Sequence, residues 1–242
     1  MLLAFIDETG DAKRKDYLGL SIAAVNGLHY PQLKNKAQAV LTSNGWDPSV
    51  EFKGAHLFSS KRGCPAVSIE QRIQIAHGLL DLNIAKQNAR MRFDFGSMTS
   101  ADTGRDYLRY LPSLLHKALG KAPRGAGKNL LAVTCDERGD IPSNALQDAI
   151  DTVARGRGFV LMERVHLARS SFDTIGLMYA DLVGYLLGRI DLISNDSELF
   201  DGLSEEELAS NNFARRLRTS QVLAGKIRRL TTYSHAFAPR TG

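Results

Sequence analysis

Residues 3–11 read LAFIDETGD, and this stretch decides the expected fold. Its apolar half is typical of a buried strand, but the strand ends in two adjacent acids, Asp7 and Glu8, followed by a glycine turn. Because side chains alternate along a strand, Asp7 shares a face with Phe5. Glu8 is expected on the opposite face unless the turn rotates it. Burial of a carboxylate is unfavourable unless cations or hydrogen-bond donors compensate it, so these acids form a candidate site.

The rest of the chain alternates between expected strands and helices. Strands are expected at about 2–8, 17–25, 89–96, 129–137 and 158–167. Helices are expected at about 31–43, 68–82, 103–119, 143–154 and 172–191, with a further helical region at 204–230. This alternation predicts an α/β fold with a mixed central β-sheet flanked by α-helices, antiparallel in its first strands and parallel in its central ones. We expect one domain over residues 1–242, with a core at about 1–191 and a C-terminal helical extension at about 200–232.

Two further acids stand where burial is expected. Asp136 ends the apolar run LLAVTC, and Asp181 lies in the helical stretch FDTIGLMYADLVGYLLGRI. Small residues recur every fourth position beside Asp181, and they would let this helix approach the sheet closely: Gly176, Ala180, Gly184 and Gly188. Taken singly, Asp7 and Asp136 are explained as acids at strand ends, and Asp181 as a helix residue paired with Arg189 or a loop arginine. Together they form a cluster of hard oxygen ligands.

Such a cluster favours a particular class of metal ion. Carboxylate oxygens suit Mg²⁺ or Mn²⁺, whereas zinc prefers thiolate and imidazole ligands. Two divalent ions about 3.5–4 Å apart can activate water and stabilise the leaving oxygen in phosphodiester cleavage. The acids therefore favour a metal-dependent phosphodiesterase, a hydrolase.

The order of four motifs resembles a known family. FIDETGD is similar to the opening IDESGD of a widespread bacterial and phage domain-of-unknown-function family, the one numbered 3800. EFKGAH at 51–56 matches its short E-x-K segment, and TCDE matches its acid at the end of a central strand. SSFDTIGLMYADLVGYLLG matches its C-terminal helix S…IGLQLADLVAG. The matches span residues 3 to about 190, with Thr9 in place of the common Ser and Met178 where Gln is frequent.

The resemblance implies a ribonuclease-H-like fold and an acidic site. The catalytic set it implies comprises Asp7, Asp136, Asp181 and Glu51, and the metal-binding set comprises Asp7, Glu8, Asp136 and Asp181. Glu8 and Glu51 either bind the ion themselves or contact the residues that bind it. Lys53 or His56 would contact a phosphate, although Glu51 and Lys53 also fit an exposed strand pair. The family supplies no substrate, because its members are mostly uncharacterised.

Charge distribution adds a weaker indication. The net charge is +5, and basic residues gather at 13–15, 59–63, 120–128, 154–158 and 214–230. These stretches fit either a solvated surface or contacts with the phosphate backbone of nucleic acid. The expected partner is nucleic acid, RNA or DNA, and the sequence predicts no oligomeric state.

Other properties bear on location. No run approaches the roughly 18 apolar residues that a membrane helix needs, and the N-terminus lacks the basic region and cleavage site of a signal peptide. Cys64 and Cys135 form neither a metal-type spacing nor a disulfide framework. We therefore expect a cytoplasmic protein without a membrane segment.

Two alternatives to a nuclease remain open. The strand followed by Asp, Thr and Gly also suggests the first phosphate loop of actin-like ATPases and sugar kinases, but the stretch at 120–128 lacks P-loop spacing. A non-catalytic protein of ribonuclease-H-like fold that binds nucleic acid or another partner would also fit. Cleavage of labelled RNA or DNA separates a nuclease from the non-catalytic binding protein, and calorimetry with ATP tests the nucleotide-binding alternative.

Overall fold

The computed structural model describes residues 1–10, 16–58, 67–84, 91–120, 129–195, 222–223 and 231–233. The strands are β1 (Leu2–Thr9), β2 (Tyr17–Asn26), β3 (Arg92–Thr99), β4 (Leu130–Asp136), β5 (Val160–Leu161), β6 (His166–Ala168) and β7 (Thr231–Tyr233). The helices are α1 (Tyr30–Ser43), α2 (Ile69–Ile84), α3 (Thr103–Leu119), α4 (Ser143–Gly156) and α5 (Ile175–Asn195), with a short 3₁₀ helix η1 (Gly54–Phe58). Most of the helical region expected at 204–230, and the basic stretches at 13–15 and 59–63, lie outside the described residues.

The strands form one mixed sheet in the order β5-β4-β1-β2-β3-β7, with β6 also paired to β4. β1, β2 and β3 are antiparallel neighbours, whereas β4 runs parallel to β1 and both β5 and β6 run parallel to β4. The predicted mixed sheet, with antiparallel first strands and parallel central strands, is confirmed.

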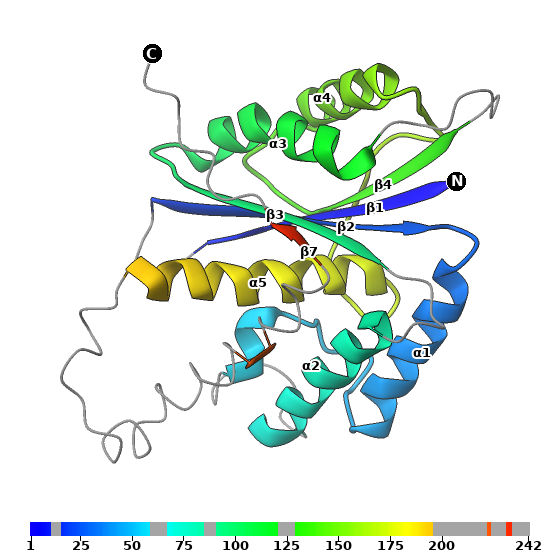
Figure 1. Ribbon diagram of the computed structural model, residues 1–242, viewed down its shortest axis with the longest axis vertical. Helices are drawn as coiled ribbons and strands as arrows, with labels where there is room; N and C mark the ends of the chain where they lie inside the picture. The colour runs from blue at the N-terminus through cyan, green and yellow to red at the C-terminus, as the bar shows by residue number, and fades with distance from the viewer. Residues whose placement is uncertain are drawn as a thin grey trace.

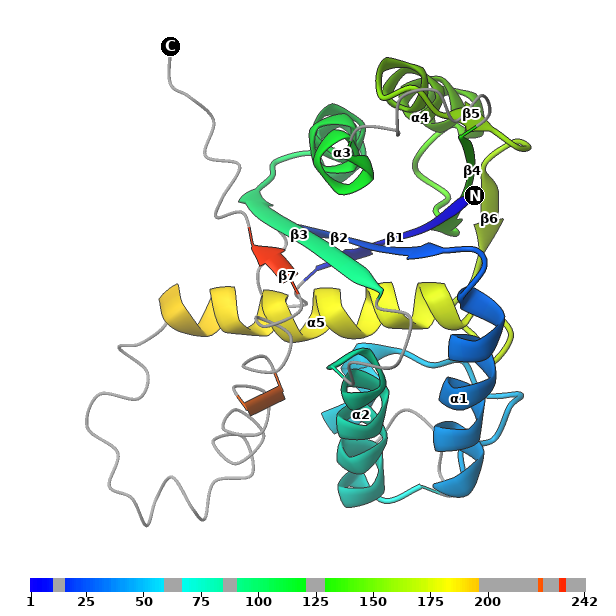
Figure 2. The same cartoon turned by 45° about the vertical axis from the view of Figure 1, so that its right-hand side comes forward.

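Helices cover both faces of this sheet. α3 and α4 lie on one face, and α5 lies against the other, between the sheet and the pair α1 and α2 (Figure 1 and Figure 2). Alternation along β1 divides its side chains between two cores: Ile6 packs on the side of α3 and α4, and Phe5 packs on the side of α5. Asp7 follows Phe5 in this alternation, so it belongs to the α5 side.

The row of small residues on α5 allows the close approach expected from the sequence. A methyl group on Gly176 would lie 2.2 Å from the ring of Phe5, and one on Gly184 would lie 2.9 Å from Oγ of Ser21. Ser21 also donates a 2.7 Å hydrogen bond to the carbonyl oxygen of Ala180. The backbone of α5 therefore lies directly on β1 and β2, which carries Asp181 to the sheet.

Three expected boundaries differ from the structure. The strand expected at 158–167 is two short strands, β5 and β6. Between them the chain leaves the sheet, and the backbone N–H of Val165 donates to Oε1 of Gln147 at 2.7 Å. The helix expected at 172–191 begins only at Ile175 and continues to Asn195, since hydroxyl hydrogen bonds around Thr174 hold a turn before it. The strand expected at 89–96 is β3, which runs on to Thr99.

Candidate metal centre

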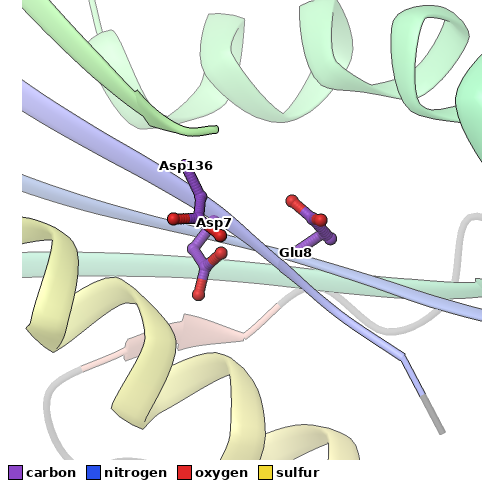
Figure 3. Close-up of side chains that lie close together, drawn as sticks. All are labelled: Asp7, Glu8 and Asp136. Carbon is purple, nitrogen blue, oxygen red and sulfur yellow. The ribbon is translucent and has the colours of Figure 1, made fainter. Parts of the chain in front are cut away.

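Three carboxylates meet at the end of β1 and β4. Asp7, Glu8 and Asp136 each offer an oxygen, and these oxygens all lie within 4.8 Å of one another (Figure 3). The parallel register pairs Ile6 with Cys135, so the next residues of the two strands, Asp7 and Asp136, follow side by side. Glu8, which alternation places towards the other face, nevertheless reaches the same cluster.

Asp7 is the most enclosed of the three. It is only 3% exposed. Burial raises the pKa of its carboxyl well above the usual value, and repulsion from Asp181, Glu8 and Asp136 raises it further. Lys53 offsets part of this effect. A bound cation would relieve the same repulsion, so Asp7 is suited to hold one.

Asp181 comes to the cluster from α5. It is buried, and its Oδ2 accepts a 2.6 Å hydrogen bond from the backbone N–H of Gly54 at the start of η1. Burial raises the pKa of Asp181 to about 7, although Lys53, the Gly54 N–H and a side-chain hydrogen bond with Asp7 each act to lower it. Asp181 thus contacts Asp7 but is not among the three residues whose oxygens lie within 4.8 Å of one another.

Lys53 joins Glu51 to the acids. Its Nζ lies 3.3 Å from Oδ2 of Asp136 and 3.3 Å from Oε1 of Glu51. Burial lowers the pKa of Lys53, but attraction to the surrounding carboxylates, Asp136 first, outweighs burial and raises it. Glu51 and Lys53 do not form the strand pair that the sequence left open. Glu51 instead contacts Lys53, which in turn contacts Asp136.

His56 lies in η1, in the same segment. Its carbonyl oxygen accepts a 2.8 Å hydrogen bond from Nη1 of Arg72, which is itself buried. This contact anchors the backbone of η1, the element whose first residue, Gly54, holds Asp181. A phosphate contact by the His56 side chain remains a prediction.

Arg138 is a site residue that the sequence reasoning missed. It follows β4 by two residues, and its Nη1 lies 3.3 Å from Oε1 of Glu8. Burial raises the pKa of Glu8, and the charge of Arg138 is the main influence that opposes this rise. The only sequence signal was its place directly after the acids Asp136 and Glu137.

Two oxygens of the cluster show that a cation fits. Oε2 of Glu8 and Oδ1 of Asp136 are buried and accept no hydrogen bond from the described residues. The other oxygen of each carboxylate faces a basic side chain, Arg138 or Lys53. Buried oxygens without a donor are unfavourable, and hard oxygen ligands are those that Mg²⁺ and Mn²⁺ prefer. The donor set therefore suits such an ion.

Of the expected basic stretches, only residues 154–158 are described completely. Nη2 of Arg155 pairs with Oδ2 of Asp151 at 2.6 Å, one helical turn away, and Nε of Arg157 donates to the carbonyl oxygen of His116 at 2.8 Å. Both contacts are structural, which favours the solvated-surface interpretation for this stretch.

Comparisons with known proteins found similarity to solved structures. No family model matches the chain, and no curated protein sequence matches it. Solved structures that the chain resembles include ribonuclease HII of Archaeoglobus fulgidus in its complex with PCNA, at 12% identity and a TM-score of 0.46, covering 93% of this chain and 91% of that one. Another is ribonuclease H2 of Pyrococcus horikoshii OT3, at 13% identity and a TM-score of 0.42, covering 94% and 99%.

The strand order, with helices on both faces of the sheet (Figure 1), defines an α/β fold with a mixed central sheet, as the sequence predicted. Within the described ranges, no helix combines the length and apolar character required to cross a membrane.

Proposed function

We propose that this chain is a divalent-metal-dependent nuclease that hydrolyses phosphodiester bonds of RNA or DNA. The observation that carries the proposal is the meeting of Asp7, Glu8 and Asp136 within 4.8 Å, with buried oxygens that accept no hydrogen bond from the described residues. These three residues would hold Mg²⁺ or Mn²⁺. The motif order that resembles the bacterial and phage family supports this acidic site. The proposed protein is a single domain over residues 1–242 that acts in the cytoplasm on nucleic acid.

When bound, the ion would supply positive charge that activates water and stabilises the developing charge on phosphate oxygens. The other residues of the chain have separate roles. Asp181 is hydrogen-bonded to Asp7, and a pKa of about 7 suits it to accept a proton near neutral pH. Lys53, about 29% exposed, carries a positive charge beside the ligands and would contact a phosphate of the substrate. Glu51 would hold Lys53 in place.

The test is cleavage of end-labelled single- and double-stranded RNA and DNA in Mg²⁺ or Mn²⁺, by wild type and by Asp7→Asn and Asp136→Asn. We expect cleavage that EDTA abolishes and that both variants lose by more than about 100-fold, since even groups behind metal ligands contribute 10–100-fold. The matched control is Asp173→Asn, an acid that is 86% exposed and lies outside the cluster. It should retain wild-type activity.

Three outcomes would contradict the proposal. Cleavage that persists in both variants would place the activity outside this cluster. Salt-sensitive binding of nucleic acid without cleavage would favour the non-catalytic binding protein. Binding of ATP in calorimetry would favour the actin-like or sugar-kinase-type nucleotide binder.

A further inference from the structure

The placement of Glu8 needs an explanation, because the strand directs it away from Asp7. In β1 it pairs with Leu20, a residue of the core beneath α3, whereas Asp7 lies on the side of α5. An oxygen of Glu8 nevertheless lies within 4.8 Å of oxygens of Asp7 and Asp136. Glu8 also forms an ion pair with Arg138, whose Nη1 lies 3.3 Å from Oε1.

Arg138 is itself held in a fixed orientation. Its Nε donates to Oδ1 of Asp140 at 2.9 Å, and its Nη2 donates to Oδ2 of the same carboxylate at 2.6 Å. The guanidinium carbon lies 4.8 Å from the centre of the Tyr107 ring on α3, within the range of a cation–π contact. With only 11% of its side chain exposed, Arg138 presents its remaining nitrogen, Nη1, to Glu8.

We propose that Arg138 is the positioning residue that makes Glu8 a metal ligand. Its Nη1 makes no hydrogen bond to the described residues but forms an ion pair with Oε1, and it leaves Oε2, which is buried and accepts no hydrogen bond from the described residues, to bind the ion beside Asp7 and Asp136. This inference rests on the metal site of the proposed function. Asp140 and Tyr107 fix the orientation of the Arg138 guanidinium. Residues that contact metal ligands commonly orient those ligands in this way.

The direction in which metal affinity changes when Arg138 is replaced separates a positioning role from a purely electrostatic one. A guanidinium near a divalent cation repels it, so removal of the charge alone would tighten metal binding. Loss of positioning would weaken it, because Glu8 would then be free to turn away. Arg138→Met therefore tests which effect is larger.

The experiment measures Mn²⁺ affinity by isothermal titration calorimetry in wild type, Arg138→Met, Glu8→Gln and the double variant. We expect Arg138→Met to weaken Mn²⁺ binding by about tenfold and the double variant to bind no more weakly than Glu8→Gln. Arg138→Lys should recover part of the loss, since an ammonium can still pair with Glu8. Arg155→Met, at a 77% exposed arginine, is the matched control and should bind as wild type does.

Asp140→Asn keeps Arg138 and gives a second test if Arg138→Met does not fold. It weakens the two-point contact at a site that is 49% exposed, and we expect a severalfold loss of Mn²⁺ affinity. Unchanged or tighter binding in Arg138→Met, or losses that add in the double variant, would overturn the role of Arg138 while leaving the metal site intact. A wild-type protein that binds no Mn²⁺ would overturn both this inference and the proposed function.

Discussion

Oδ2 of Asp181 accepts a 2.6 Å hydrogen bond from the backbone N–H of Gly54, a residue 127 positions earlier in the chain. This contact ties α5 to η1 and fixes the acid that is hydrogen-bonded to Asp7. It depends on the absence of a side chain at residue 54, because a methyl group there would lie 2.5 Å from Cβ of Tyr185.

Gly54→Ala should therefore push η1 away from α5. We expect the free energy of unfolding to fall by about 1–3 kcal/mol, the usual range for an inserted carbon in a packed interior. Chemical denaturation measures this change. Gly156→Ala is the matched control, because a methyl group at residue 156 has nothing within 4 Å. If both variants were equally stable, the close contact between η1 and α5 would be refuted.

The pKa of Asp181 predicts how the stability of the metal-free protein depends on pH. Burial raises this pKa from 3.8 to about 7, so the folded state binds the proton more tightly than the unfolded chain does. The stability that the proton provides is complete below about pH 4 and is lost as the pH rises to about 7. In EDTA, Asp181→Asn should lose much of this dependence and become more stable than wild type at pH 8, by more than about 1 kcal/mol.

Denaturation midpoints of the two proteins at pH 5 and pH 8 measure the effect. Asp173→Asn, at an exposed acid, should show the wild-type dependence on pH. An Asp181→Asn protein that is less stable than wild type at pH 8 would show that the carboxylate is stabilised in the fold rather than strained by burial.

Replacement of Lys53 should increase the affinity for the metal ion but decrease nuclease turnover. Nζ of Lys53 lies 3.3 Å from Asp136, so its charge opposes a divalent ion held by the same carboxylate. We expect Lys53→Met to bind Mn²⁺ on the order of tenfold more tightly while nuclease turnover falls. Calorimetry and a cleavage assay measure the two effects.

Lys34→Met is a close control for this substitution. Lys34 is 30% exposed, Lys53 is 29% exposed, and each pairs with an acid, but the partner of Lys34 is Asp173, outside the cluster. It should leave both Mn²⁺ affinity and turnover unchanged. If Mn²⁺ bound more weakly to Lys53→Met, Lys53 would instead be an organiser of Asp136.

Metal binding should stabilise the folded protein. An ion that binds only the folded state at 100 times its Kd adds about 2.7 kcal/mol to the free energy of unfolding. We therefore expect Mn²⁺ to raise the melting temperature of wild type, and EDTA to reverse the rise. Asp136→Asn should show little shift, because it loses one of the three oxygens that meet within 4.8 Å. An equal shift in this variant would place the bound ion elsewhere.

Local sequence predicted much of the framework. The alternation along β1 placed Asp7 on the face of Phe5, which the structure shows to be the side of α5, and the four-residue spacing from Gly176 to Gly188 predicted the close approach of that helix. These are properties of neighbouring residues, so a periodic pattern carries them. The break between β5 and β6 escaped prediction, because the Gln147 contact that satisfies Val165 comes from a different helix.

By itself, the sequence determined that acids end two strands and lie on one helix beside a small-residue row. Only the tertiary structure decided which oxygens meet: Glu8 reaches Asp136 although alternation directs it away from Asp7, and Lys53 pairs with Asp136 across 83 residues of sequence. Arg138 entered the site for the same reason. Charges interact through space, so which charged groups come together depends on how the strands and helices pack. The spacing of these residues along the chain does not determine that packing.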